Sequence, residues 1–198
     1  MDDVSDQIAG VDEVGRGALF GPVVAAAVIL SNTATQQLVH QGMTDSKKLS
    51  PQRRLVLVDQ IREMATGFRV GMASVYEIDR HNILQASLLA MRRSVLGLPV
   101  TPQLCLVDGN QQIPDLPMLQ KTVIKGDQSE PAIAAASILA KVWRDQLITR
   151  LAQRYPGYDL ASNKGYGSAK HRQALQALGP TRQHRLSFAP CQVSLLKN

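Results

Sequence analysis

The first thirty residues contain two apolar segments that predict neighbouring strands. Residues 8–14 form the first, and residues 22–30 (PVVAAAVIL) form the second. The second segment is apolar at every position, which is typical of a central strand that is covered on both faces. Gly15, Arg16 and Gly17 lie between the two segments and predict a turn. This part of the chain therefore predicts the start of a β-sheet.

The pattern that follows alternates between helices and strands. Ser50 precedes Pro51, and Ser74 precedes Glu77 by three residues, so both serines are typical of helix N-caps. We predict helices over 51–65, 74–96 (with a break near Asn82) and 131–155, and strands over 68–73, 103–108 and 121–125. The alanine-rich start of the last helix predicts a close approach to another element. The fold class is α/β, and no internal repeat is visible.

Residues 156–198 differ from the rest of the chain in composition and charge. Glycines and prolines separate short helical patterns there, which predicts a helical appendage packed on a main domain of residues 1–155. This part carries six basic residues and one acid (6 − 1 = +5), while the preceding residues carry 16 basic and 15 acidic residues (16 − 15 = +1). Such asymmetry favours a polyanionic partner, nucleic acid rather than a membrane.

The two cysteines, Cys105 and Cys191, have no spacing typical of a metal site and indicate a reducing compartment. The acidic start of the chain does not resemble a secretory signal, and no apolar stretch reaches the length of a membrane span. We expect a soluble, cytoplasmic, monomeric protein with no membrane partner.

Three apolar segments end on carboxylates. Asp12 and Glu13 follow residues 8–11, Asp108 follows residues 104–107, and Asp127 follows residues 123–126. If these strand ends adjoin in one sheet, the four carboxylates repel one another, and bound divalent cations relieve that repulsion. Oxygen ligands favour Mg²⁺ or Mn²⁺. Zinc is disfavoured, because the cysteines and the four histidines form no cluster in the sequence.

Two of these acids leave alternatives open. Successive strand residues point to opposite faces, so Asp12 and Glu13 cannot both reach one metal as regular strand neighbours. Either a bulge occurs there, or Glu13 binds a second ion or contributes its backbone carbonyl. Asp127 stands just before a helix, where a turn or capping role is a simpler account of an aspartate.

Seven segments together resemble one enzyme family, bacterial ribonuclease HII, which belongs to the type 2 ribonucleases H. They are GVDEVGRG (10–17), GPVVAAAVIL (21–30), DSKKLS (45–50), VDGN (107–110), KGD (125–127), AAASILAKVWRD (134–145) and KGYGSAKH (164–171). The resemblance covers roughly residues 9–190 in order. It implies a ribonuclease H-like mixed sheet flanked by helices, with a C-terminal helical part. Ala18 and Ser168 depart from the usual pattern, and the link from Asp108 to Asp127 is about one residue longer than usual.

The resemblance also implies an activity and its residues. It implies hydrolysis of the phosphodiester 5′ to ribonucleotides, in RNA/DNA hybrids and at single ribonucleotides in duplex DNA, with two metal ions and with 3′-hydroxyl and 5′-phosphate products. Asp12, Glu13 and Asp108 take the place of the family's metal ligands, and Asp127, preferred over Asp145, takes that of its fourth acid. The resemblance assigns recognition of the 2′-hydroxyl to Gly15, Arg16 and Gly17, and stacking on the following deoxyribose to Tyr166.

We further expect phosphate contacts from polar and basic residues near these segments: Ser46, Lys47, Lys48, Lys164 and Lys170. Two other functions remain open from the sequence. One is a different two-metal nuclease of the same fold, either ribonuclease HIII-like or resolvase-like. The other is a basic nucleic-acid-binding module without catalytic activity. Arg16 between the two glycines, and a start close to the first strand, favour the ribonuclease HII assignment.

Overall fold

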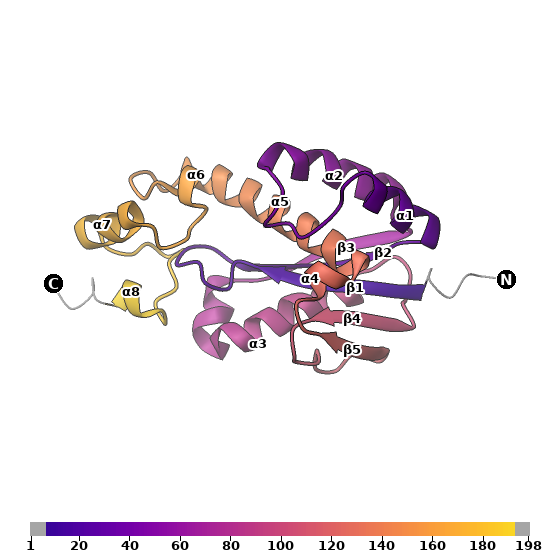
Figure 1. Cartoon of the computed structure of the whole chain (residues 1–198). Helices are drawn as coiled ribbons and strands as arrows, with labels where there is room; N and C mark the ends of the chain where they lie inside the picture. Colours follow the sequence, from indigo (N-terminus) through magenta and orange to yellow (C-terminus); the bar gives the residue numbers. More distant parts are fainter. Residues whose placement is uncertain (1–6, 193–198) are drawn as a thin grey trace.

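A five-stranded mixed sheet forms the centre of the computed structural model, which describes residues 7–192 (Figure 1). The strands are β1 (Ile8–Val14), β2 (Val23–Ile29), β3 (Gly67–Ala73), β4 (Leu104–Asp108) and β5 (Leu119–Val123). They lie in the order β3-β2-β1-β4-β5. The pairs β1–β2 and β2–β3 are antiparallel, and the pairs β1–β4 and β4–β5 are parallel. The predicted α/β class with a mixed sheet is confirmed.

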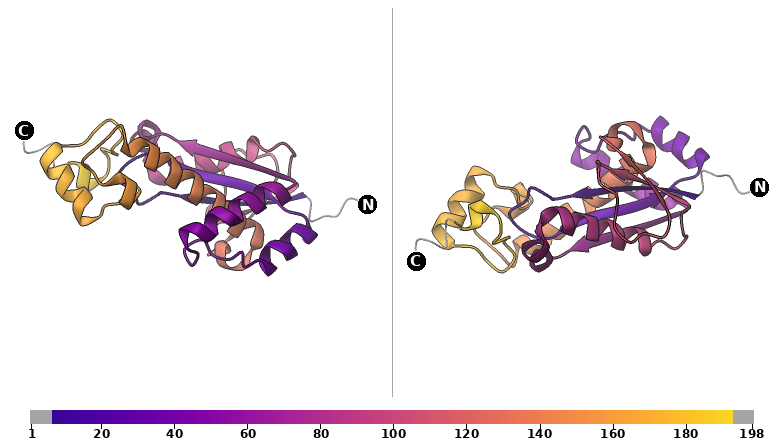
Figure 2. Two further views of the ribbon diagram at one scale, coloured as in Figure 1. Left: turned by 90° about the horizontal axis from the view of Figure 1, so that it is seen from above. Right: turned by 90° about the horizontal axis from the view of Figure 1, so that it is seen from below.

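Helices cover both faces of the sheet, as the two views in Figure 2 show. The helices are α1 (Asn32–His40), α2 (Pro51–Met64), α3 (Val75–Leu96), α4 (Gly126–Ser129), α5 (Pro131–Ala152), α6 (Leu160–Asn163), α7 (Ala169–Leu178) and α8 (Ala189–Gln192). In β2, Val23 and Ala25 pack in the core beneath α3, while Val24 and Ala26 pack in the core beneath α1, α2 and α5. This two-sided burial explains why β2 is apolar at every position.

Helix α5 lies very close to β1, as its small side chains predicted. A Cβ atom on Gly10 would lie only 2.1 Å from the backbone carbon of Ala132. Ala135 and Ala136 are fully buried on the same helix. Glycine on the strand and alanines on the helix together allow this contact, and it sets the distance between α5 and the carboxylates that follow Gly10.

The predicted break in α3 is present. Ser74 and Glu77 form a capping box, and Asn82 interrupts the helix with a φ of 68°.

Two predictions about elements need correction. Helix α1 was not predicted, because its sequence NTATQQLVH is mostly polar and has only two buried residues, Ala34 and Leu38.

The second correction concerns β5. It ends at Val123 rather than at residue 125, because its parallel register pairs Val123 with Asp108, and Lys125 then adopts a left-handed conformation. Asp127 therefore lies in the first turn of α4, not at the end of a strand.

The C-terminal segments α6, α7 and α8 lie beyond one end of the sheet (Figure 1). Their apolar residues Leu160, Leu175 and Cys191 share a third core with Phe20, from the β1–β2 connection, and Ile148 of α5. Two isolated β-bridges, Ala18 to Tyr166 and Phe20 to His184, tie the same connection to this part of the chain. The β1–β2 connection is thus held between the sheet and the C-terminal segments.

Candidate active site

Two of the predicted acids occupy successive positions of a regular strand. Asp12 pairs with Ala26 and Glu13 with Ala25, without interruption, so the bulge considered from the sequence is not present. Asp12 is almost completely buried on the α5 side of the sheet. Its Oδ1 accepts a hydrogen bond of 2.7 Å from the backbone N–H of Glu13. The two carboxylates therefore leave β1 on different faces, as the strand geometry requires.

Asp108 stands at the end of β4, next to β1 in the sheet. Its Oδ1 accepts a hydrogen bond of 2.7 Å from the N–H of Gly126, at the start of α4. That bond joins the end of β4 to the turn that carries Asp127, which is 5% exposed. Asp127 in turn accepts a hydrogen bond of 3.0 Å from the Lys47 ammonium. Three elements, β1, β4 and α4, thus bring the four acids together.

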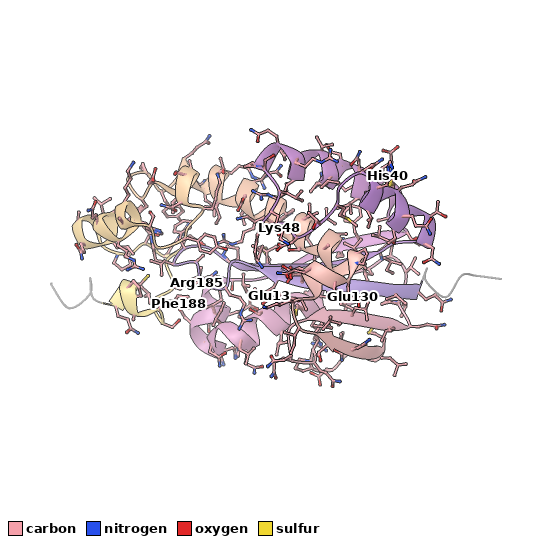
Figure 3. All side chains as sticks on the ribbon, in the orientation of Figure 1. Glu13, His40, Lys48, Glu130, Arg185 and Phe188 are labelled. Carbon is pink, nitrogen blue, oxygen red and sulfur yellow. The ribbon has the colours of Figure 1, made fainter. Side chains whose placement is uncertain are left out.

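A polar pocket of about 260 Å³ opens over these strand ends. It is lined by Asp12, Glu13, Val14, Ser46, Lys47, Asp108, Ser137, Lys141 and Tyr166. Asp127 is not among the lining residues and reaches the pocket through its bond to Lys47. Figure 3 shows Glu13 near the middle of the sheet, with Lys48 on the side of α2. A smaller pocket on the α3 side is also lined by Glu13 and Asp108, so these two acids lie between two hollows.

Burial and mutual repulsion make the acids hard to ionise. Desolvation, together with the charges of Glu13 and Asp108, raises the pKa of Asp12 well above its usual value of 3.8. Burial likewise raises the pKa of Glu13 and of Asp108. Arg16 partly offsets this at Glu13, because its Nη1 lies 3.1 Å from the Glu13 carboxylate. A cation bound among these carboxyl groups would therefore stabilise their ionised form, which burial and repulsion otherwise disfavour.

The carboxylates of the site are suitable ligands for a hard divalent cation. Their ligand atoms are all oxygens, which Mg²⁺ and Mn²⁺ prefer. Within residues 7–192, no three acidic, histidine or cysteine side chains are already gathered closely enough to enclose an ion.

Helix α5 supplies two pocket residues that the sequence interpretation missed, Ser137 and Lys141. Ser137, Lys141 and Asp145 are spaced four apart and so share one face of the helix. Ser137 forms a buried hydrogen bond of 2.9 Å with the predicted residue Ser46, and Lys141 lines the pocket. Asp145 pairs with Lys141 at 3.0 Å. The four-residue spacing within AAASILAKVWRD was the signal that pointed to Lys141.

The predicted recognition residues lie next to the pocket. Tyr166 lines it, with Lys141 and Arg144 at 5.7 and 5.4 Å from the centre of its ring. Gly15 has a φ of 90°, and a Cβ atom there would lie 2.2 Å from the Arg144 side chain. A side chain at Gly15 would therefore collide with a buried group, which explains the glycine in this turn. The β-bridge from Ala18 brings the Gly15–Gly17 turn and Tyr166 to the same side of the site.

Other predicted phosphate contacts lie outside the pocket. Lys48 and Lys170 are exposed and line none of the pockets described above. The Lys164 ammonium donates hydrogen bonds to Thr149, at 2.8 Å, and to the carbonyl of Ala161. Arg185, one of the six basic residues counted in residues 156–198, is fully buried and adds no charge to the surface. Lys197, in the same count, lies outside the described residues.

The histidines of the C-terminal part are core residues. His171 and His184 are buried, with their Nε2 atoms 3.1 Å apart. Backbone N–H of Thr181 donates to His184 Nδ1, so His184 carries its proton on Nε2 and donates it to His171. His171 Nδ1 then donates to the carbonyl of Tyr166 at 2.9 Å. Two neutral imidazole rings satisfy this chain of hydrogen bonds, which ends at Tyr166, one of the residues that line the pocket.

The sheet order and the acids on its two central strands define the class of this protein: it is a metal-dependent nuclease with a ribonuclease H-like fold. The family assignment is more specific. The chain belongs to the ribonuclease HII family, whose model matches residues 9–191. Members of this family are endonucleases of the hydrolase class. Within residues 7–192, no helix is long and apolar enough to cross a membrane.

A close relative agrees with this assignment, and solved structures share the fold. The chain is 86% identical to the ribonuclease HII of Acaryochloris marina over 196 residues, which cover 99% of each chain. Its fold is similar to that of ribonuclease H2 from Pyrococcus horikoshii, with a TM-score of 0.84, 24% identity, and coverage of 96% of this chain and 97% of that one. A Bst-RNase HIII structure in complex with Mn²⁺ has a TM-score of 0.78 and 20% identity, and covers 98% of this chain and 70% of that one.

Proposed function

We propose that this protein hydrolyses the phosphodiester on the 5′ side of ribonucleotides, both in RNA/DNA hybrids and at single ribonucleotides within duplex DNA. The observation that carries the proposal is the juxtaposition of the acidic pocket with Tyr166 and the Gly15–Gly17 turn. Cleavage chemistry and a surface suited to a sugar thereby occur within one site. Membership of the ribonuclease HII family supports the same reaction.

Asp12, Glu13, Asp108 and Asp127 are the residues that would hold the metal, as two Mg²⁺ or Mn²⁺ ions. The all-oxygen ligands and the elevated pKa values of three of these acids support this. The Mn²⁺ complex of the HIII protein with the same fold is consistent with it. The chemistry that two such ions would supply is an activated water molecule and stabilisation of the charge that develops on the phosphate. The expected products are a 3′-hydroxyl and a 5′-phosphate.

The protein's own residues position the substrate around this centre. Lys47 and Lys141 line the pocket from two sides, where their ammonium groups would contact phosphate oxygens. Lys48, Lys164 and Lys170 lie farther out and would contact the more distant backbone. Asp12 is held by the N–H of Glu13, and Asp108 by that of Gly126, so both carboxylates have defined orientations before substrate binds.

Recognition of the ribonucleotide requires detection of one hydroxyl group, since the 2′-OH is the feature that distinguishes RNA from DNA at a given site. The glycines at 15 and 17 allow the backbone of the turn to come within hydrogen-bonding distance of that hydroxyl. Tyr166 offers a ring face to the neighbouring deoxyribose. We further propose that residues 1–155 form the catalytic domain, that residues 156–198 pack on it to carry Tyr166, and that the protein acts as a monomer.

A nicking assay tests the proposal. The substrates are a duplex with one embedded ribonucleotide, the matching all-DNA duplex, and a hybrid with one all-RNA strand, each incubated with Mg²⁺ or Mn²⁺. We expect a single nick on the 5′ side of the lone ribonucleotide and no cut in all-DNA. Cleavage confined to runs of RNA would indicate a ribonuclease HIII-like enzyme, and cleavage of branched DNA would indicate a resolvase. Binding without cleavage of any substrate would indicate a non-catalytic module.

A further inference from the structure

Two arginines beside the site, Arg144 and Arg185, are completely buried. Neither forms an ion pair with any acid in the described part of the chain, and Nη2 of Arg185 has no hydrogen-bond partner there. An unpaired buried charge is unfavourable, so these guanidinium groups are retained against a large desolvation cost. Burial, and repulsion by Arg144, lower the pKa of Arg185 to about 9. Because this burial is costly, we expect the two arginines to have a role besides stabilisation of the fold.

Their N–H groups are directed at backbone carbonyls. Arg144 donates to the carbonyls of Pro22 (3.1 Å), Phe20 (3.0 Å) and Lys164 (2.9 Å). Arg185 donates to the carbonyls of Gly21 (3.0 Å) and Arg16 (2.7 Å). Four of these five acceptors thus belong to the connection between β1 and β2.

Within residues 7–192, the hydrogen bonds to the carbonyls of Arg16, Phe20, Gly21 and Pro22 come from these two arginines. The β1–β2 connection leaves the sheet at Val14 and rejoins it at Val23, so residues 16–22 lie outside the strand pairing. Phe20 and Gly21 are buried there, and buried carbonyls need a donor. A guanidinium supplies several N–H donors in a rigid planar arrangement, so it can hold two carbonyls at fixed positions. A lysine ammonium concentrates its donors on one nitrogen at the end of a flexible chain and does not fix two carbonyls in the same way.

We propose that Arg185 is a positioning residue for ribonucleotide recognition, which holds the Gly15–Gly17 turn in place through the carbonyl of Arg16. Arg144 has the same role for the second recognition element, because it holds Lys164, lies against the Tyr166 ring and packs on Gly15. Figure 3 shows Arg185 on the C-terminal side of Glu13. The inference rests on the proposed function, and it assigns part of substrate choice to a side chain that contacts no substrate.

The test separates recognition of the ribonucleotide from general binding of duplex. Nicking of a single-ribonucleotide duplex gives KM and kcat, and inhibition of that reaction by unlabelled all-DNA duplex gives Ki. In Arg185→Lys we expect KM to rise about fivefold, the loss expected for about one hydrogen bond, while Ki stays unchanged. A purely structural role would lower kcat by reducing the fraction of folded enzyme, and would leave both KM and Ki unchanged.

Arg93→Lys is the matched control. Arg93 also uses its guanidinium fork, on Glu77 and on the carbonyl of Met72, but it lies on α3 away from the turn. Its KM and Ki should equal those of the wild type. Arg144→Lys is the second variant, and its KM should also rise at constant Ki. Melting curves recorded first give an assay temperature at which each variant is folded.

The outcomes are distinguishable from failure of the proposed function. If the wild-type protein does not nick the single-ribonucleotide duplex, the proposed function is wrong. If the wild type nicks it and both arginine variants keep the wild-type KM, or raise KM and Ki by the same factor, the positioning role alone is overturned.

Discussion

The ammonium of Lys47 lies 3.0 Å from Oδ2 of Asp127, so a positive charge already stands beside the proposed metal site. This hydrogen bond also raises the pKa of Lys47. Asp127 is buried while Lys47 is largely exposed, which leaves the lysine free to move away without unfolding its surroundings. The Lys47 ammonium is therefore well placed to compensate the charge of the acids until a divalent cation binds.

This arrangement predicts that Lys47→Ala binds divalent cations more tightly than the wild type. Removal of the positive charge of Lys47 leaves the repulsion between the acids less compensated, so a cation gains more by binding there. An ion pair with one exposed partner is worth about 1 kcal/mol, which corresponds to about a fivefold gain in cation affinity. Titration calorimetry with Mn²⁺ alone measures the affinity. Lys48→Ala is the control, because Lys48 is exposed and pairs with no acid in the described residues. Equal affinities in all three proteins would contradict the prediction.

The position of Tyr166 at the rim of the pocket predicts a selective defect in Tyr166→Ala. Loss of the ring removes stacking worth about 1–3 kcal/mol, so we expect kcat/KM on a single-ribonucleotide duplex to fall about tenfold. An all-RNA strand offers many cleavable positions and should lose less. Tyr166→Phe keeps the ring and should behave as the wild type on both substrates. Equal losses on the two substrates in Tyr166→Ala would rule out a role at the junction.

The paired histidines predict a pH dependence of stability. Burial, together with the nearby His171, lowers the pKa of His184 to about 4, from an ordinary value of 6.5. The unfolded chain therefore binds protons more readily, and the stability that the neutral pair provides is complete above pH 6.5 and is lost as pH falls towards 4. The shift corresponds to about 3 kcal/mol.

Urea unfolding in EDTA at several pH values tests this for the wild type and for His184→Gln. The free energy of unfolding of the wild type should decrease more between pH 6.5 and 4 than that of the variant. The acids with raised pKa act in the opposite direction, but they are present in both proteins and cancel in the comparison. His81→Gln, at an exposed position, should follow the wild type. Parallel curves for the wild type and His184→Gln would refute the assignment.

Much of the fold was predictable because burial leaves a strong pattern. The fully apolar segment at 23–29 could only be a central strand, and carboxylates after apolar runs marked Asp12 and Asp108 at the ends of neighbouring strands. The Ser74–Glu77 capping box and the break at Asn82 were also predictable, because local hydrogen bonds determine both. These features depend on residues close together in the chain.

Features that depend on distant contacts were not predictable. In the sequence, Arg185 is one of several basic residues in a polar segment, and only the fold shows that it is buried against carbonyls of the β1–β2 connection. Asp127 was placed at a strand end, since its true position depends on the register of β5 against β4 and on the left-handed Lys125. Lys141 was missed because its four-residue spacing from Ser137 shows that the two share a helix face, but only the fold shows that this face meets the pocket.

The central claim is that the acids of this pocket perform metal-dependent cleavage, and Asp108→Asn tests it most directly. The substitution keeps the size of the side chain and an acceptor for the Gly126 N–H, but removes the charge. We expect nicking of a single-ribonucleotide duplex with Mg²⁺ or Mn²⁺ to fall by more than about a hundredfold while duplex affinity is retained. Asp115→Asn, on an exposed loop, should nick like the wild type. Normal nicking by Asp108→Asn would contradict the account.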